Sequence, residues 1–200
     1  SANGQELPVS QSDRFMTVTR ITTSSSTWLG PATRSRNLAR LAGAARVDLT
    51  PELGVALMGY GARVGTAQSV ADRLHARAIA LDDGGTNSLI AVSADLCLMA
   101  PEQALSVRER IAAATGVGIP RILVACTHTH SGPDTGLADL LAGRPVPPHV
   151  PSILEGIAAA AVQAWRAREP ATFAWTRTRA RIGRNRRVED APIDESVEVL

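Results

Sequence analysis

Residues 121–136 decide both the fold and the candidate site, and they read Arg121-Ile-Leu-Val-Ala-Cys-Thr-His-Thr-His-Ser-Gly-Pro-Asp-Thr-Gly136. The apolar run predicts a buried β-strand over 121–127 that leads directly into His128 and His130. Side chains two residues apart at a strand end point to the same side, and neutral imidazole is the commonest metal ligand in proteins. The pair therefore predicts two nitrogen ligands beside a Gly-Pro loop. The alternative is a hydrogen-bonded structural role.

The segment before this strand predicts a crossover connection. Residues 88–96 form another apolar strand, and Pro101 begins a helix that extends to about Thr115, with Gly116 just past its end. Strand, helix and strand make one crossover unit, so the two strands should be parallel. The apolar stripe of the helix is expected to consist of Ala104, Val107, Ile111 and Ala114.

Asp95 stands at the end of the first of these parallel strands, as His128 does at the end of the second. In open α/β sheets, ligands bind outside the carboxyl ends of the strands. Asp95, His128 and His130 should therefore share one crevice. Asp95 could orient an imidazole or bind a metal itself, and the alternative is that it caps the loop that follows.

The remaining N-terminal elements complete a mixed sheet. A short strand is predicted over 44–49, and a strand over 74–81 forms an antiparallel hairpin with the strand at 88–96 through a turn at 82–85. The loop that contains Met58-Gly-Tyr-Gly61 lies between the first two strands. These elements predict an α/β fold with a mixed sheet, a parallel βαβ crossover and flanking helices, incomplete at the C-terminus.

The C-terminal part adds one helix and two strands. Ser152 and Glu155 form a capping box that predicts a helix to about Arg168. A strand is expected over 171–182, and another begins at Glu195 and is interrupted at Leu200. The chain thus ends within an element, which suggests a piece of a longer protein.

Composition limits the class of protein. Residues 1–40 are polar and rich in Ser and Thr, which predicts a mobile tail or the remnant of a leader. No run of about 18 apolar residues exists, so no transmembrane segment is expected, and no signal-peptide pattern is visible. All 21 basic residues are Arg, and from Val47 onward fifteen Arg face seventeen acids. The folded part is thus near neutral, which argues against a nucleic-acid binder.

Two cysteines and two further histidines have structural interpretations. Cys97 and Cys126 fall at or near the ends of apolar strands, where small buried side chains are expected. A disulfide would require those strands to be neighbours. For Cys126 to be a metal ligand, its side chain and that of His128 would have to converge around Thr127. His75 lies within an alternating strand and is expected to be structural, whereas His149 is expected to face solvent in a Pro-rich loop.

An arginine-rich segment lies near the C-terminus. Arg177, Arg179 and Arg181 alternate, so they line one face of a strand, and Arg184, Arg186 and Arg187 follow in a turn. One interpretation is a charged, solvated edge that resists aggregation. The other is that Asn185 and Arg186 reach the crevice and hold a substrate oxygen or an oxyanion.

The histidine motif, Thr127-His-Thr-His-Ser-Gly-Pro133, resembles the signature of the neutral/alkaline (non-lysosomal) ceramidases. Four more segments resemble the family in order and spacing: Met58-Gly-Tyr60, Arg73-Leu-His-Ala-Arg-Ala78, Ser93-Ala-Asp-Leu96 and Gly183-Arg-Asn-Arg186. The resemblance covers about residues 41–200, which we interpret as the N-terminal part of a catalytic domain.

The resemblance implies a zinc-dependent amide hydrolase that cleaves an N-acyl sphingoid lipid to a fatty acid and a sphingoid base. It implies that His128 ligates Zn²⁺, that His130 lies beside the reacting water or carbonyl oxygen, and that Arg186 contacts the substrate. His130, Arg186 and Asp95 are the candidate catalytic residues. The remaining ligands, a later His, a Glu and a Tyr, lie beyond residue 200 in the family's order, so this piece alone is expected to be inactive. A secreted or periplasmic location is also implied, and no oligomeric state is indicated.

Three alternatives stay open. The metallo-β-lactamase fold also places His-x-His after an apolar strand, but its motif continues with Asp-His where this chain has Gly132 and Pro133. A ceramidase-like metallohydrolase could act on another amide or ester, because Ala71 stands where the family often has a His. A non-catalytic domain that binds lipid or protein is the third alternative, and its binding activity should survive removal of metal.

Overall fold

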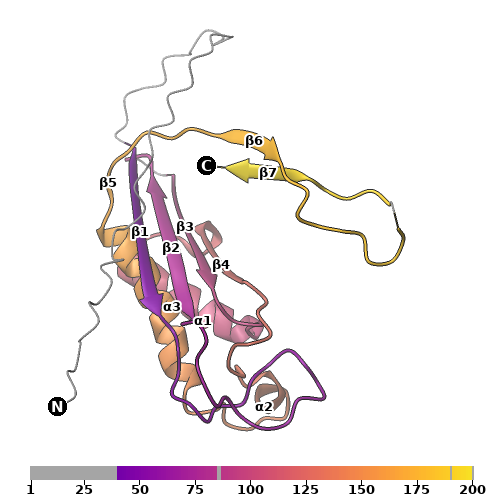
Figure 1. Ribbon diagram of the computed structural model, residues 1–200. Helices are drawn as coiled ribbons and strands as arrows, with labels where there is room; N and C mark the ends of the chain where they lie inside the picture. Colours follow the sequence, from indigo (N-terminus) through magenta and orange to yellow (C-terminus); the bar gives the residue numbers. More distant parts are fainter. Residues whose placement is uncertain (1–39, 85–86, 190, 200) are drawn as a thin grey trace, which may run out of the picture. The chain divides into compact units, whose positions relative to one another are not determined.

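The structure is a computed structural model that describes residues 40–84, 87–189 and 191–199 (Figure 1). The tail predicted over 1–40 lies outside the described residues except for Arg40, and the domain boundary at residue 41 stays a prediction. None of the described helices is both long and apolar enough to cross a membrane.

Five strands form the main sheet in the order β4-β3-β2-β1-β5 (Figure 1). Their bounds are β1 Leu41–Asp48, β2 His75–Asp82, β3 Ser88–Ala94, β4 Ile122–Cys126 and β5 Glu169–Pro170. β2 and β3 form the predicted antiparallel hairpin, although Gly85 of its turn lies outside the described residues. β3 and β4 are parallel, with Ala94 opposite Cys126. The mixed sheet with a parallel crossover is therefore confirmed.

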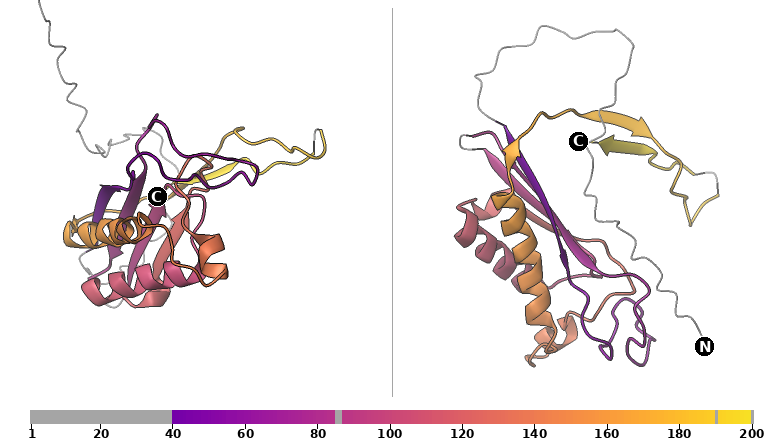
Figure 2. Two further views of the ribbon diagram at one scale, coloured as in Figure 1. Left: turned by 90° about the horizontal axis from the view of Figure 1, so that it is seen from below. Right: turned by 60° about the vertical axis from the view of Figure 1, so that its left-hand side comes forward.

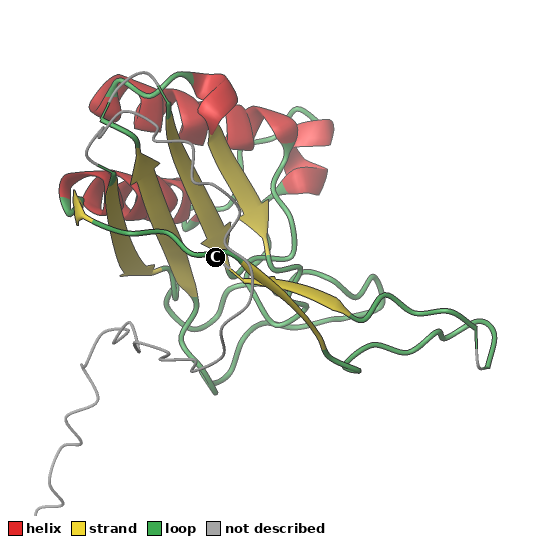
Figure 3. Cartoon of the chain, turned by 90° about the horizontal axis from the view of Figure 1, so that it is seen from above, coloured by secondary structure: helices red, strands yellow, loops and turns green. Residues whose placement is uncertain are grey.

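Two long helices cover one face of this sheet (Figures 2 and 3). α1 Pro101–Thr115 is the crossover helix and packs on β4, while α3 Val150–Arg166 packs on β1, β2 and α1. α1 ends as predicted at Gly116, whose φ of 77° is a left-handed conformation that glycine adopts at little cost. A 3₁₀ turn, Ile119–Arg121, leads into β4, and the short helix α2 Leu137–Leu141 follows the Gly-Pro loop.

Small side chains let α3 lie close to the sheet. Ala76, Ala78 and Ala80 alternate along β2 and are almost fully buried in the same core cluster as the buried alanines of α3. The approach is closest at Gly43 on β1, where an added Cβ would lie 2.1 Å from the backbone oxygen of Ala164. The many alanines of this chain therefore serve to bring a helix backbone against a sheet backbone.

The start of α3 differs from the prediction. The capping box of Ser152 and Glu155 is not formed, because the N-cap is His149, three residues earlier, and the helix begins at Val150. Ser152 Oγ instead donates to the backbone oxygen of His149 at 2.9 Å. Pro151 within the first turn favours the earlier start, since its missing N–H needs no partner there.

The buried face of α1 was only partly predicted. Val107 and Ile111 are buried, but Ala114 is exposed and Gln103 is buried. Gln103 Oε1 accepts from the N–H of Ala100 at 2.9 Å, and its Nε2 donates to the backbone oxygen of Thr135 at 2.8 Å. Apolar periodicity misses such a residue, because the amide becomes tolerable in the core only through bonds to distant backbone.

Only residues 176–179 of the strand predicted over 171–182 form a strand. β5 pairs with β1, whereas β6 Thr176–Arg179 pairs with β7 Ser196–Val199 in a separate two-stranded sheet. β5 lies before the predicted range, and alternation within a segment cannot show how much of it finds a partner strand. The final strand begins within one residue of the predicted Glu195, and Leu200 lies outside the described residues.

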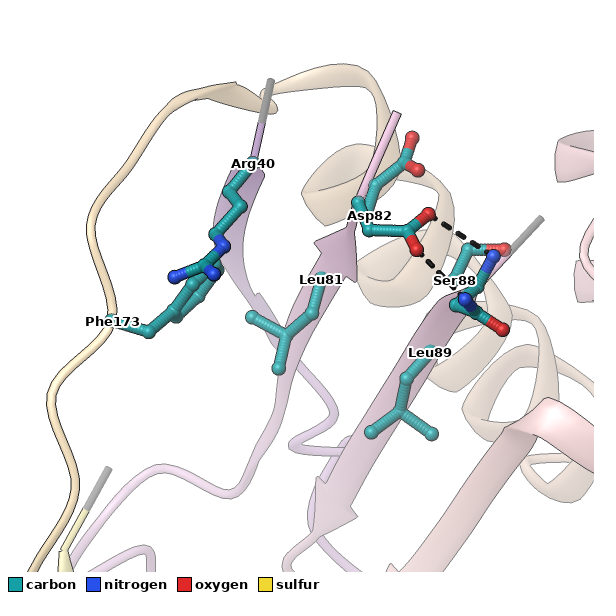
Figure 4. Close-up of a pocket in the computed structure, with 8 residues that line it drawn as sticks. Arg40, Leu81, Asp82, Ser88, Leu89 and Phe173 are labelled. Atoms are coloured by element: carbon teal, nitrogen blue, oxygen red, sulfur yellow. Dashed lines mark hydrogen bonds between the residues drawn. The ribbon is translucent and has the colours of Figure 1, made fainter. Parts of the chain in front are cut away.

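The sheet face away from α1 and α3 carries exposed apolar side chains, among them Ile79 and Leu123. At one end of this face a hollow of about 320 Å³ is lined in part by Leu81, Leu89 and Phe173 (Figure 4). It lies where β2 ends and β3 begins, which is the opposite end of β3 from Asp95. No histidine lines it, so it is not part of the candidate site.

Gly43→Ala should lower the free energy of unfolding by about 1–3 kcal/mol, because the new methyl group overpacks the contact with Ala164. Gly118→Ala is the matched control, since Gly118 has φ −64° and the new Cβ would lie 3.8 Å from the nearest atom, Cδ of Pro120. Urea denaturation of both variants measures the free energies of unfolding to be compared. Equal stability of the two variants would contradict the close approach of α3.

Candidate metal centre

The two histidines lie just after the end of β4, as predicted. His128 has a φ of 60°, and it is the only non-glycine residue with a positive φ within residues 40–84, 87–189 and 191–199. Such conformations are uncommon and concentrate at functional sites. The turn ends the strand alternation, yet the rings of His128 and His130 remain neighbours, with centroids 4.9 Å apart.

The orientation of His128 is fixed by a main-chain hydrogen bond. Its Nδ1 lies 2.8 Å from the backbone oxygen of Cys97, in the segment that follows β3. A carbonyl oxygen can only accept, so Nδ1 carries the proton and donates. Nε2 of the neutral ring then keeps its lone pair, which is the state that a metal ligand requires.

Cys97 brings a sulfur atom to the same place. Its Sγ and one nitrogen from each of His128 and His130 lie within 4.8 Å of one another, and Cys97 is 3% exposed. The distance from Sγ to His128 Nδ1 is 3.8 Å, close to the edge of about 3.6 Å expected between sulfur and nitrogen ligands of tetrahedral zinc. Sequence reasoning missed this residue, because an isolated Cys after an apolar strand has the pattern of a core side chain.

These contacts offer two arrangements that exclude each other. If His128 Nδ1 donates to the Cys97 carbonyl oxygen, only Nε2 can bind a metal. If Nδ1 binds the metal together with Cys97 Sγ, the bond to the carbonyl must break. The 2.8 Å contact favours the first arrangement.

Cys126 is not in the cluster. Cys97 and Cys126 are both free thiols, although their segments are neighbours as a disulfide would require. Burial raises the pKa of the Cys126 thiol, and the nearby Cys97 raises it further. Cys126 packs against the hydrophobic core, as the sequence predicted.

A loop between β1 and β2 forms one wall of the site. The Tyr60 ring meets the His130 ring edge-on at a centroid distance of 4.7 Å. Arg63 Nη1 donates to the backbone oxygen of His130 at 2.7 Å. The sequence predicted a loop here but gave no sign of its contact with the histidines, because that contact joins residues 67 positions apart.

The Gly-Pro loop beside the histidines is held from three directions. The N–H of Met58 donates to the backbone oxygen of Gly132 at 3.1 Å, and the N–H of Asp134 donates to that of Ala56 at 2.8 Å. Gln103 of α1 binds the backbone at Thr135, as described above. The loop is therefore part of the packed structure rather than a free edge.

His149 supplies the third attachment, and its predicted solvent-facing position is wrong. Its Nε2 lies 2.7 Å from the backbone oxygen of Asp134, to which it donates. The residue is the N-cap of α3, so the helix start and the Gly-Pro loop are tied together. His75 is half-buried, and its N–H donates to an Asp95 carboxylate oxygen at 3.0 Å.

Asp95 lies at the same end of the sheet as His128, because β3 and β4 are parallel. Its carboxylate accepts from His75 N–H and from Arg77 Nη1, the latter at 2.7 Å. Among the described residues, no hydrogen bond joins Asp95 to the ring of His128 or His130. The acceptor for His128 is the Cys97 carbonyl oxygen, and a catalytic role of Asp95 stays a prediction.

The arginine-rich segment divides into paired and unpaired side chains. Arg177 pairs with Glu198, and Arg179 and Arg181 both pair with Glu195. Asn185 Oδ1 accepts from the N–H groups of two following residues and so shapes the turn. Arg186 is exposed and forms no ion pair in the described part of the chain. Its predicted contact with the substrate stays a prediction.

The sequence and the structure are both similar to those of known ceramidases. Residues 41–193 match the family described as neutral/alkaline non-lysosomal ceramidase, N-terminal. A crystal structure of neutral ceramidase from Pseudomonas aeruginosa is similar with a TM-score of 0.63 and 25% identity, over 73% of this chain and 24% of that one. A structure described as ceramidase complexed with C2 is similar with the same score and identity, over 72% and 24%. The chain thus spans about a quarter of these relatives, and it belongs to the neutral/alkaline non-lysosomal ceramidase family.

Proposed function

We propose that the protein is a zinc-dependent amide hydrolase that cleaves N-acyl sphingoid lipids to a fatty acid and a sphingoid base. The observation that carries the proposal is the imidazole of His128, whose Nδ1 is bound to a carbonyl oxygen and whose Nε2 is left for a metal beside His130. Membership of a hydrolase family supports the reaction class. By the same resemblance we propose a secreted or periplasmic location.

The donor set fits zinc. Imidazole nitrogen is a ligand that zinc accepts, and the hydrogen bond to the Cys97 carbonyl oxygen leaves Nε2 of His128 available. A hydrolytic zinc site keeps one position open, where the ion polarises a carbonyl group and lowers the pKa of water to about 7. In this proposal His128 is one ligand, and the others, a His, a Glu and a Tyr, come from the part of the protein beyond residue 200.

The other candidate residues act on the substrate. His130, whose ring packs beside that of His128, is proposed to carry a proton between the attacking water and the leaving amine. Arg186 is proposed to donate hydrogen bonds to the carbonyl oxygen that gains charge or to a substrate hydroxyl. Asp95 is proposed to orient an imidazole or to bind the metal. Its carboxylate forms an ion pair with Arg77 in this structure.

His128→Ala in the full-length protein should lose zinc and amidase activity together, because it removes a ligand from the site. Metal analysis after dialysis and hydrolysis of an N-acyl sphingoid substrate give the two readouts. Stoichiometric zinc in the variant would refute the assignment of His128. A full-length protein that binds lipid equally well with and without the metal, and shows no amidase activity in either state, would instead be a binding domain.

Cys97→Ala serves as the matched control for this experiment. The substitution keeps the backbone oxygen that orients His128 and removes only the thiol. We therefore expect zinc to be retained. Loss of zinc from this variant would show that the thiolate ligates the metal and that Nδ1 is the coordinating nitrogen of His128.

Arg186→Ala should slow turnover by about a hundredfold or more while zinc stays bound, since a donor near developing charge is removed. Arg184→Ala and Arg187→Ala are controls from the same exposed turn, and we expect both to be nearly silent. Steady-state kinetics of the three variants make the comparison. Equal effects would mean that the turn is only a solvated basic segment.

A further inference from the structure

We propose that Tyr60 and Arg63, in the loop between β1 and β2, are positioning residues that hold the His130 imidazole in its reactive orientation. The inference rests on the proposed function, in which His130 carries a proton, and it extends the site to a loop far from it in sequence.

The loop forms a turn that brings its two functional side chains together. The N–H of Arg63 donates to the backbone oxygen of Tyr60 at 3.0 Å, which closes the turn. The Arg63 guanidinium then lies over the Tyr60 ring at 4.9 Å from its centroid. The same guanidinium donates to the backbone oxygen of His130 at 2.7 Å. Arg63 therefore ties the Tyr60 ring and the His130 backbone into one unit.

The Tyr60 ring contacts the His130 imidazole directly. The two rings meet at 4.7 Å between centroids with an interplanar angle of 85°, an edge-to-face geometry that aromatic rings prefer. In contrast to His128, His130 has no hydrogen bond on a ring nitrogen to any described residue. Ring packing is thus the contact that sets its rotation. Tyr60 is 60% exposed, so its place is not explained by burial in the core.

Gly59 completes the contact. A Cβ added at Gly59 would lie 2.4 Å from Cγ of His130, and its φ of 114° is one that glycine tolerates and other residues rarely adopt. The loop backbone therefore lies directly against the imidazole. The backbone of Gly59 and the ring of Tyr60 therefore both lie against the His130 imidazole.

The test compares Tyr60→Ala with Tyr60→Phe in the full-length enzyme, with Val64→Ala as the control. Val64 belongs to the same loop and is 93% exposed, so its side chain is largely in solvent. We expect Tyr60→Ala to lower kcat by up to about a hundredfold, the effect of misplacing a reacting group by about 1 Å. KM and zinc content should not change. Tyr60→Phe should keep kcat close to that of the wild type, because it retains the ring that packs on His130 and removes only the hydroxyl group.

Each other outcome has a definite meaning. If His130→Ala lowers kcat and Tyr60→Ala does not, the positioning role is wrong and the proposed function stands. If His130→Ala has no effect on kcat, the proton-carrying role of His130 in the proposed function is wrong, and the positioning role of Tyr60 is wrong with it. A rise in KM at constant kcat in Tyr60→Ala would make Tyr60 a substrate contact and would also overturn the inference.

Discussion

The hydrogen bond from His128 Nδ1 to the Cys97 backbone oxygen is the interaction on which the candidate site depends. It joins the segments that follow two parallel strands, so it requires the crossover through α1. The residue that donates it, His128, also has a positive φ, so an uncommon backbone conformation and this bond occur at the same residue. One bond therefore links the topology of the sheet to the protonation state of a ligand.

Around this bond, backbone groups do most of the positioning. The Gly-Pro loop is held by main-chain bonds from the β1–β2 loop, and Gln103 and His149 bind two of its backbone oxygens. Each of these contacts satisfies a polar group that would otherwise cost free energy near the core. The result is a rigid support for the imidazoles, which a hydrolytic site needs because small displacements of reacting groups slow catalysis strongly.

The sequence was most informative where a local pattern is enough. The apolar runs, Pro101 and Gly116 predicted the crossover, and the parallel pairing then placed Asp95 and His128 at one end of the sheet. It was least informative where distant segments meet. Cys97, Gln103 and His149 each have ordinary local patterns, and their partners lie 15 or more positions away. The Arg-rich strand predicted over 171–182 is present only over Thr176–Arg179, because its partner, β7, is four residues long and pairs with no more of it.

The protonation state of His128 in the metal-free protein is the most direct test of this account. Nitrogen NMR of protein labelled at histidine distinguishes the two neutral tautomers through their ring proton couplings. The account predicts the Nδ1–H tautomer, held by the Cys97 carbonyl oxygen, with Nε2 unprotonated. The Nε2–H tautomer would contradict it, because the carbonyl bond could not then exist and Nδ1, beside the Cys97 thiol, would be the nitrogen left for the metal.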